Sequence, residues 1–211
     1  MTNAIDLYGA PRSTCTRRVA LIAKERNIPY NLTPVDLMKG EHTHASYREH
    51  QPFGQVPYIT HDGFELFESR AIGRYLATLG SGTELVPTEP RARAKFEQAA
   101  SIEYTQFDPV ASTIAYEKVF KKYLGQETNE PLVTELVARL NSKLDAYEVI
   151  LGKQKYLAGE AVTLADLYHL PYGTIIFEHL KLGGLDGRPN VQRWWKDITS
   201  RPTWQAVKDA A

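Results

Sequence analysis

Hydrophobic and polar positions follow one pattern up to about residue 80 and a different one beyond it. In the first part, short apolar runs typical of strands alternate with segments of helical periodicity. The turn Asp62-Gly63 lies between two such runs, which is a strong signal of a hairpin. The pattern predicts helices over 14–26 and 69–79, and strands over 4–8, 30–35, 56–59 and 64–66.

Beyond residue 80 the strand pattern disappears. Residues 81–90 are rich in Gly, Pro and Thr, which is typical of a linker. Periodicity then predicts helices over 90–123, 131–151, 163–180, 189–200 and 202–209, with a loop at 125–129 and kinks at Pro109 and Pro171.

Two domains are therefore expected, α/β followed by all-α. Residues 1–80 have the order βαβ–ββα, which resembles the thioredoxin-like fold and predicts a central sheet with helices on its faces. Residues 91–211 form the all-helical second domain.

Composition narrows the function classes. Of the 211 residues, 43% are hydrophobic and 24% are charged, as in an ordinary globular protein. The 25 Lys and Arg residues balance the 25 Asp and Glu residues, so charge gives no reason to expect nucleic acid or a membrane as partner. A single cysteine, Cys15, excludes an intramolecular disulfide and a cysteine-based zinc cluster. Because the sequence also has no secretory signal and no run of 18 apolar residues, we expect a cytoplasmic protein.

Ser13 lies where the first strand gives way to the first helix, in the sequence RSTCTRRV. Backbone N–H groups and the helix dipole at such a position favour a nearby anion, and a hydroxyl there can donate to a thiolate. A second interpretation makes Ser13 only the helix cap, with its oxygen accepting an N–H two or three residues on. From these eight residues alone the cap is favoured, and both interpretations remain open.

Cys15 and the two histidines of the sequence GEHTH are weaker candidates. Cys15 lacks the second cysteine of a thioredoxin-type pair, and two positions after Ser13 on a helix it points about 200° away, so packing is the better interpretation. His42 and His44 are two residues apart and lack the i, i+4 spacing of a helical metal site, so we expect no metal. One imidazole can hydrogen-bond a ligand carboxylate, or both can lie on the surface.

The sequence QPFGQVP, residues 51–57, forms another cluster. A proline that opens a strand cannot donate to the sheet, and the Val56-Pro57 bond can be cis. A cis bond would turn the backbone of Val56 outward, free to pair with an extended peptide. A loop followed by an edge strand explains the same residues equally well.

Two helix starts complete the candidates. Ser69 is a good N-cap, and its N–H and hydroxyl suit a substrate carboxylate while Glu68 can accept from an ammonium group. Taken alone, an ordinary solvated helix start is the better interpretation of this pair. Thr163 and Asp166 are spaced as a capping box, to which we assign a structural role.

Together these motifs resemble the cytosolic glutathione transferases along nearly the whole chain, and most closely the phi class of plants and fungi. The resemblance rests on Ser13 six residues before Val19, and on the sequences KGEH (39–42), PFGQVP (52–57), ESRAI (68–72) and VTLADL (162–167). Five short matches in the same order and at consistent spacing make chance agreement implausible.

The resemblance implies a role for each matching residue. Ser13 matches the catalytic serine, and Glu68 and Ser69 match the clamp on the γ-glutamyl end of glutathione. Gln55 and the backbone of Val56, before a cis Pro57, match the residues that hold the cysteinyl part. His42, and with it Thr43, match the side chains near the glycyl carboxylate, although many phi members have a basic residue in place of Thr43.

The implied activity is activation of the glutathione thiol by Ser13. A free cysteine thiol titrates near about 8.5, so the hydroxyl and the helix dipole would have to stabilise the thiolate. The thiolate then attacks an electrophilic, hydrophobic acceptor or an organic hydroperoxide, with glutathione as co-substrate and no cofactor. Related thiol-exchange enzymes have cysteine at the position of Ser13. A non-catalytic ligand-binding or regulatory protein is the alternative, against which the intact set at 13, 55, 68 and 69 argues.

The resemblance also implies an acceptor pocket and a homodimer. In the dimer, Phe53 would enter an apolar pocket of the partner. Arg12 would either pair with anionic acceptors or point into water. The residues expected to line the acceptor pocket are Pro11, Arg12, Leu37, Ile114, Ala115, Lys118 and Val119.

Overall fold

A computed structural model describes residues 3–211, which form two compact units. One unit contains the chain up to Val86 together with Arg201–Ala211, and the other contains Pro87–Ser200. The sequence predicts residues 201–211 as part of the helical domain, whereas in the structure these residues belong to the unit that contains the sheet. The reason lies at α1, where the Arg17 guanidinium sits 5.8 Å from the centre of the Trp204 ring.

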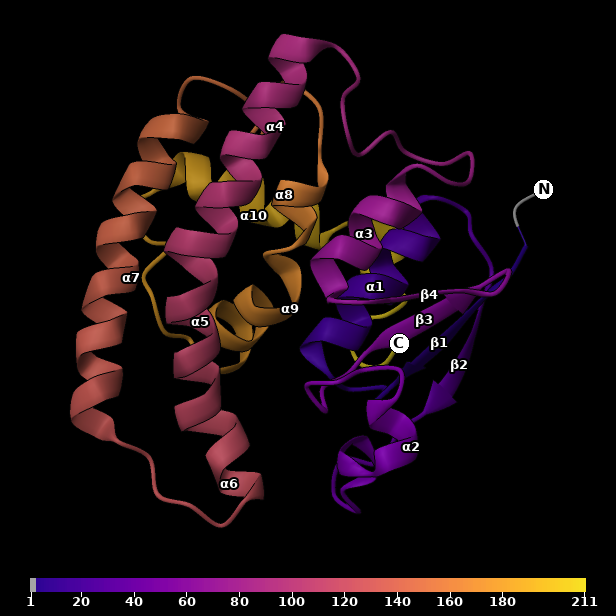
Figure 1. The fold of residues 1–211 in the computed structure, drawn as a ribbon. Helices are drawn as coiled ribbons and strands as arrows, with labels where there is room; N and C mark the ends of the chain where they lie inside the picture. The colour runs from indigo at the N-terminus through magenta and orange to yellow at the C-terminus, as the bar shows by residue number, and fades with distance from the viewer. Residues whose placement is uncertain (1–2) are drawn as a thin grey trace. The chain divides into compact units, whose positions relative to one another are not determined.

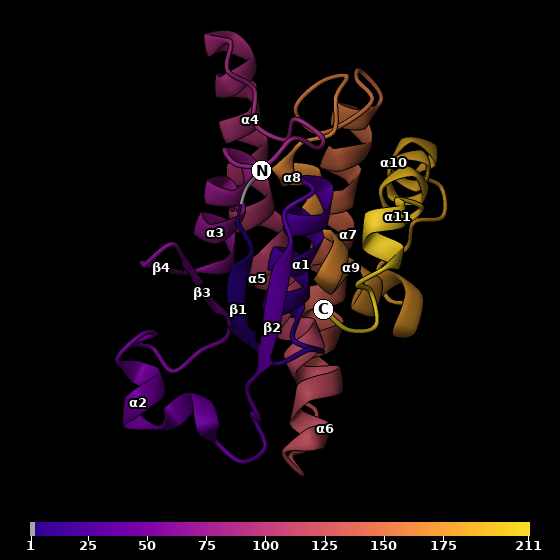
Figure 2. The same ribbon diagram turned by 90° about the vertical axis from the view of Figure 1, so that its right-hand side faces the viewer.

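The first unit is built on a four-stranded mixed sheet in the order β2-β1-β3-β4 (Figures 1 and 2). Its strands are β1 (Ile5–Gly9), β2 (Tyr30–Pro34), β3 (Tyr58–His61) and β4 (Phe64–Phe67). β1 runs parallel to β2 and antiparallel to β3, and β4 completes the predicted hairpin. β3 begins two residues later than expected, directly after Pro57, which has no N–H to donate to a ladder.

Helices α1 (Thr14–Glu25) and α3 (Ser69–Ala77) pack against each other beside the sheet (Figure 1). Their fully buried apolar side chains include Ile22 and Ile72, and the sheet contributes the fully buried Leu7 and Ile59. The thioredoxin-like arrangement predicted for this part of the chain is thus confirmed.

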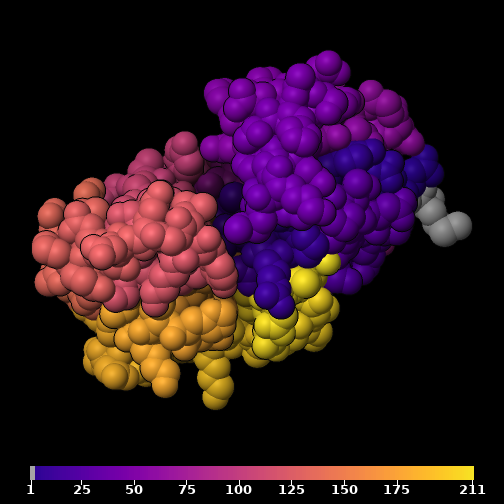
Figure 3. Space-filling view, turned by 90° about the horizontal axis from the view of Figure 1, so that it is seen from below, coloured from indigo at the N-terminus to yellow at the C-terminus, as the bar shows by residue number. Residues whose placement is uncertain are grey.

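Shorter elements complete the first unit. Sequence patterns did not reveal the 3-10 turn Glu41–Thr43 or helix α2 (Ala45–Arg48), because four residues are too few to show a period. After α11 (Pro202–Gln205), the Ala211 N–H donates to the Pro11 carbonyl at 2.9 Å. Figure 3 shows these C-terminal residues, in yellow, beside the indigo N-terminal part of the same unit.

Arg26 holds the start of the linker. Its buried guanidinium donates to four backbone carbonyl oxygens, those of Leu79, Gly80, Gly82 and Thr83, at 2.7–3.0 Å. Gly80 has a φ of +66°, in the left-handed region, and a Cβ on it would lie 2.0 Å from the Arg26 carbonyl oxygen. The segment after α3 is therefore fixed in place by the end of α1.

The second unit opens with a long helical run beside a second long helix (Figure 1). The run comprises α4 (Pro90–Ile102), α5 (Asp108–Ala115) and α6 (Lys121–Tyr123), joined by π-helical turns at Glu103–Phe107 and Tyr116–Phe120. The first π-helical turn immediately precedes the turn that carries Pro109, whose missing N–H interrupts the regular ladder.

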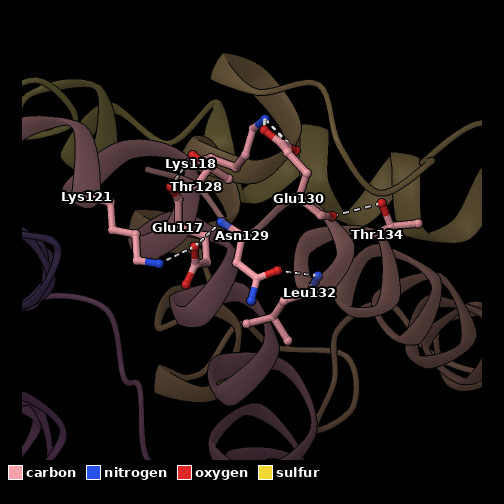
Figure 4. Close-up of polar contacts among 8 residues, drawn as sticks. All are labelled: Glu117, Lys118, Lys121, Thr128, Asn129, Glu130, Leu132 and Thr134. Carbon is pink, nitrogen blue, oxygen red and sulfur yellow. Dashed lines mark hydrogen bonds and ion pairs between the residues drawn. The ribbon is translucent and has the colours of Figure 1, made fainter. Parts of the chain in front are cut away.

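The loop expected at 125–129 is present and is anchored by a polar network (Figure 4). The buried Glu117 carboxylate accepts the Asn129 N–H at 2.8 Å and pairs with Lys121 at 2.8 Å. Asn129 in turn caps α7 (Glu130–Leu151), since its side chain accepts the Leu132 N–H at 3.2 Å. Lys118 pairs with Glu130 at 2.9 Å.

The rest of the second unit contains α8 (Leu164–Leu167), α9 (Leu170–Gly173), a π-helical segment Thr174–His179 and α10 (Pro189–Thr199). Trp194, Tyr147, Phe107 and Leu144 are among its buried side chains. Across the part of the chain that the structure describes, no helix combines the length and the apolar character needed to cross a membrane.

Candidate active site

Three of the predicted contact segments lie at one end of the sheet. The register pairs Tyr8 with Tyr58, and Tyr58 with Phe67. Because these pairs sit at the end of β1, the start of β3 and the end of β4, the segments next to them share that edge. The first segment leads to Ser13, the second contains Val56 and Pro57, and the third begins with Glu68 and Ser69.

Ser13 is the N-cap of α1 and is half-buried. Its backbone N–H donates to the Ala10 carbonyl at 2.9 Å, which closes the turn between β1 and α1. Its hydroxyl oxygen accepts the Thr16 N–H at 3.4 Å. Hydrogen bonds of this kind are usually about 2.9–3.0 Å long, so this one is long. The cap interpretation is thus correct as far as it goes, but it occupies only the oxygen and leaves the hydroxyl proton to donate elsewhere.

Gly9 brings Pro57 close to this turn. A Cβ on Gly9 would lie 2.5 Å from Thr16 Oγ1 and 3.1 Å from Pro57 Cβ, so only glycine fits between them. The Val56-Pro57 bond is cis, as the sequence suggested. Val56 itself lies outside the strand ladder, which begins at Tyr58, so its backbone groups are not committed to the sheet.

Gln55 is exposed, and its backbone is held from both sides. The Gln51 side chain, only 2% exposed, accepts the Gln55 N–H at 3.1 Å. The Tyr47 hydroxyl donates to the Gln55 carbonyl at 2.8 Å. No sequence pattern predicts these roles for Gln51 and Tyr47, although Gln51 opens the QPFGQVP motif.

Glu68 and Ser69 begin α3 with unusual geometry. Glu68 is exposed and has φ 69° and ψ 105°, a backbone conformation that L residues rarely adopt and that costs about 1–3 kcal/mol. Ser69 is 7% exposed, and its hydroxyl oxygen accepts a bond from Arg18 Nη1 at 2.9 Å. Strain of this kind is found at ligand-binding positions more often than elsewhere.

His42 lies in the 3-10 turn, on a loop that is well ordered by its own hydrogen bonds. The Glu41 carboxylate accepts the Asp36 N–H at 2.7 Å, and the Asp36 carboxylate accepts the N–H groups of Met38 and Lys39. His42 Nδ1 is buried and has no hydrogen-bond partner in the described part of the chain. An orphaned buried nitrogen fits a ligand oxygen at this point. The neighbouring Thr43 is exposed, and its hydroxyl donates to the Gly40 carbonyl at 2.7 Å.

A cluster of aromatic rings supports this end of the sheet. Tyr8 stacks on Tyr58 with ring centres 4.4 Å apart, and Tyr47 meets Tyr58 edge-on. Burial, together with the neighbouring Tyr8 and Glu65, raises the pKa of Tyr58 to about 12, and burial likewise raises the pKa of Tyr47. Both phenols therefore stay neutral near pH 7 and cannot serve as a base.

The residues expected around an acceptor fall in different settings. In the first unit Arg12 is exposed, Leu37 is 39% exposed and Pro11 is half-buried. In the second unit Ile114 and Ala115 are fully buried, while Val119 is half-buried and Lys118 pairs with Glu130. Cys15 is half-buried, with its sulfur 3.6 Å from Arg18 Nη1. Among residues 3–211, no group of three or more His, Cys, Asp or Glu side chains could hold a metal ion.

Comparison with known protein families gives the class of this chain. Residues 3–78 match the family model described as glutathione S-transferase, N-terminal domain, and residues 107–202 match the model for the C-terminal domain. The chain therefore belongs to the glutathione S-transferase family and is an enzyme of that class.

Individual relatives point to the phi-like plant members. Glutathione S-transferase PM239X14 of Arabidopsis thaliana is 50% identical over 196 residues, covering 90% of this chain and 89% of the relative. The crystal structure of glutathione transferase F7 from Populus trichocarpa is 36% identical, covers 97% of both chains and has a TM-score of 0.87. Glutathione S-transferase I from mais, in complex with an atrazine glutathione conjugate, is 31% identical with a TM-score of 0.89, covering 97% of this chain and 96% of that one.

Proposed function

We propose that this transferase activates the glutathione thiol with Ser13 and conjugates it to electrophilic, hydrophobic acceptors. The observation that carries the proposal is the hydroxyl of Ser13 at the N-terminus of α1. Its oxygen is engaged by a long bond from the Thr16 N–H, and no acceptor for its proton is found in the described part of the chain. A hydroxyl in that state can donate to a thiolate while it continues to cap the helix.

The chemistry follows from the charge of the reacting sulfur. A hydrogen bond and the positive end of the α1 dipole stabilise the thiolate more than the neutral thiol, so they lower the thiol pKa. The thiolate then forms a carbon–sulfur bond to the acceptor and expels the leaving group. With an organic hydroperoxide, the same sulfur would attack the terminal oxygen and break the O–O bond, which releases the alcohol and leaves a sulfenic acid on glutathione. A second glutathione thiol would attack that sulfur and release water, so the hydroperoxide is reduced and two glutathiones are oxidised to their disulfide.

Glutathione itself would lie across the shared end of the sheet. The backbone of Val56 would pair with the cysteinyl residue, and Gln55 and Pro57 would flank it. Glu68 and Ser69 would take the ammonium and carboxylate of the γ-glutamyl end. The unpartnered His42 Nδ1 supports a contact with the glycyl carboxylate, beside Thr43.

The bound conjugate of the mais enzyme supports an aromatic electrophile as the class of acceptor. Parallel assays with an activated halo-arene and with cumene hydroperoxide test the activity. We expect measurable conjugation, and the peroxide assay reports whether the thiolate also reduces hydroperoxides. Absence of turnover with both substrates, in a protein that still binds glutathione, would favour a non-catalytic binding protein instead.

Arg12 is the residue that we propose for acceptor selectivity. It is exposed one position before Ser13, and a guanidinium there can pair with an anionic acceptor. The kcat/KM ratio between a carboxylated acceptor and its neutral analogue should fall in Arg12→Leu. An unchanged ratio would show that Arg12 only faces water.

A further inference from the structure

We propose that Arg18 is a positioning residue, which forces the hydroxyl of Ser69 to act as a hydrogen-bond donor toward the α-carboxylate of the substrate. Arg18 is fully buried on α1, five residues after Ser13. Its Nη1 donates to Ser69 Oγ at 2.9 Å, a bond that joins α1 to the first residue of α3. The proposal rests on the proposed function, because it assumes that Ser69 meets the γ-glutamyl end of glutathione.

The direction of this hydrogen bond follows from the chemistry of the two groups. A guanidinium has five N–H donors and no acceptor, so it cannot receive the proton of Ser69. One lone pair of Ser69 Oγ is therefore taken by Arg18, and the O–H must point away from α1. No acceptor for that proton is found among residues 3–211. Ser69 is thus prepared to donate to an anion that comes from outside the chain.

The charge of Arg18 acts in the same sense. A buried guanidinium polarises the hydroxyl that it touches, and its field favours a carboxylate on the other side of that hydroxyl. The N–H groups at the start of α3, a helix of nine residues, favour the same anion. Cys15 Sγ lies 3.6 Å from the same Nη1.

The consequence is specificity for one chemical group of the substrate. A ligand with the α-carboxylate should gain from the prepared donor, while a ligand without it should gain nothing. Beside a residue that can both accept and donate, the serine hydroxyl would not be held as an outward donor, because it could donate its proton to that residue instead.

The test compares two side chains at position 18. Lysine, like arginine, has donors only, so Arg18→Lys should keep the orientation of the Ser69 hydroxyl. Glutamine can accept the hydroxyl proton, so Arg18→Gln should no longer fix the orientation of the Ser69 hydroxyl. Glutathione affinity of the full chain, measured by titration calorimetry, should fall about 10- to 100-fold in Arg18→Gln and no more than about threefold in Arg18→Lys.

A substrate analogue separates positioning from general damage. In 4-aminobutanoyl-cysteinylglycine the α-carboxylate is missing and the amine is kept. Its affinity should be the same in wild type and in Arg18→Gln. Arg17→Gln is the matched control, since Arg17 is a buried neighbour on the same helix that faces Trp204 and the Lys208 carbonyl. Glutathione affinity should not change in that control, with circular dichroism confirming that each variant is folded.

The double variant completes the cycle. Arg18→Gln added to Ser69→Ala should weaken binding no further than Ser69→Ala alone, because Arg18 acts through that hydroxyl. Equal losses for glutathione and its analogue, or additive losses in the double variant, would overturn the role of Arg18. A wild-type protein that does not bind glutathione would instead overturn the proposed function.

Discussion

At the end of α1, Glu25 is a buried carboxylate with partners far along the chain. It accepts two bonds of 2.7 Å from the Arg201 guanidinium and a third from the Thr203 hydroxyl. Burial raises the pKa of Glu25. The hydrogen bonds from Arg201 and Thr203, together with the charge of Arg201, lower it by more, so the pKa lies below its ordinary value of 4.5. Because the folded pKa is the lower one, this ion pair stabilises the fold above pH 4.5 and loses its effect as pH falls through the folded pKa.

Glu25→Gln should therefore destabilise the protein at pH 7 and flatten the acid side of its stability profile. Breaking a buried pair typically costs about 3–5 kcal/mol, and the 24% exposure of Arg201 places this pair at the lower end. Thermal unfolding measured from about pH 3 to about pH 7 reports both the loss of stability at pH 7, where the carboxylate is ionised, and the shape of the acid profile. Glu97→Gln is the control, because the Arg93–Glu97 pair is 43–48% exposed and should matter little. If stability falls with acid as steeply in Glu25→Gln as in wild type, the ion pair of Glu25 does not cause the acid dependence.

Single residues also mark the limit of what the sequence could predict. Ser13, His42 and Glu68 could be predicted as site residues because each lies in a short motif. The pairing of Arg18 with Ser69 spans 51 residues and that of Arg201 with Glu25 spans 176, and no local pattern carries such information.

Among the elements, the start of α8 follows its predicted capping box and exceeds it. The Asp166 carboxylate accepts the Thr163 N–H at 2.9 Å, and also the Leu157 N–H and the Trp194 indole N–H, each at 2.9 Å. Burial raises the pKa of Asp166, while these hydrogen bonds act in the opposite direction. One carboxylate therefore joins α8 to the loop before it and to α10.

Asp166→Ala should cost more than the loss of an ordinary cap, which is typically about 0.5–2 kcal/mol. Each buried donor left without a partner adds about 1–3 kcal/mol, so the melting temperature should fall by well over 5 °C, given about 2–4 °C per kcal/mol for a chain of this size. Glutathione affinity of the folded fraction should stay nearly the same. Asp145→Ala, at a 68% exposed aspartate, is the control. An unchanged melting temperature in Asp166→Ala would show that the network contributes nothing.

Most elements could be predicted because each has a clear period or a clear boundary. The Asp62-Gly63 turn gave the hairpin of β3 and β4, and Ser13 marked the start of α1. The π-helical turns of the second unit could not be foreseen, since they change hydrogen-bond spacing without breaking the helical pattern of side chains.

For the whole molecule, the sequence predicted two parts and a linker but not that the chain returns to its first unit after Ser200. Arg17 and Trp204 meet there, and neither shows its partner in the sequence. Assembly beyond one chain stays a prediction, for which Phe53 is the main support. Its side chain is 69% exposed, and its ring centre lies 6.1 Å from that of Phe67.

We propose that a second copy of the chain covers Phe53 in a homodimer. Burying such a ring typically contributes about 1.5–3 kcal/mol, so Phe53→Ser should raise the dimer dissociation constant more than tenfold. Sedimentation at micromolar concentration measures this directly. Tyr123→Ser, at an equally exposed aromatic residue, is the control. A wild-type monomer under these conditions would refute the proposal.

The role of Ser13 is tested most directly by the pKa of the bound glutathione thiol. Thiolate absorbance of the binary complex, titrated between about pH 5 and about pH 9, should give a wild-type pKa clearly below the free value of about 8.5. In Ser13→Ala the pKa should return toward that value, and turnover should fall about 10²- to 10³-fold, as for other donors to a reacting anion. A residue that only caps the helix would lose stability on substitution and leave the thiol pKa unchanged. If Ser13→Ala keeps both the lowered pKa and full activity, then Ser13 does not activate the thiol.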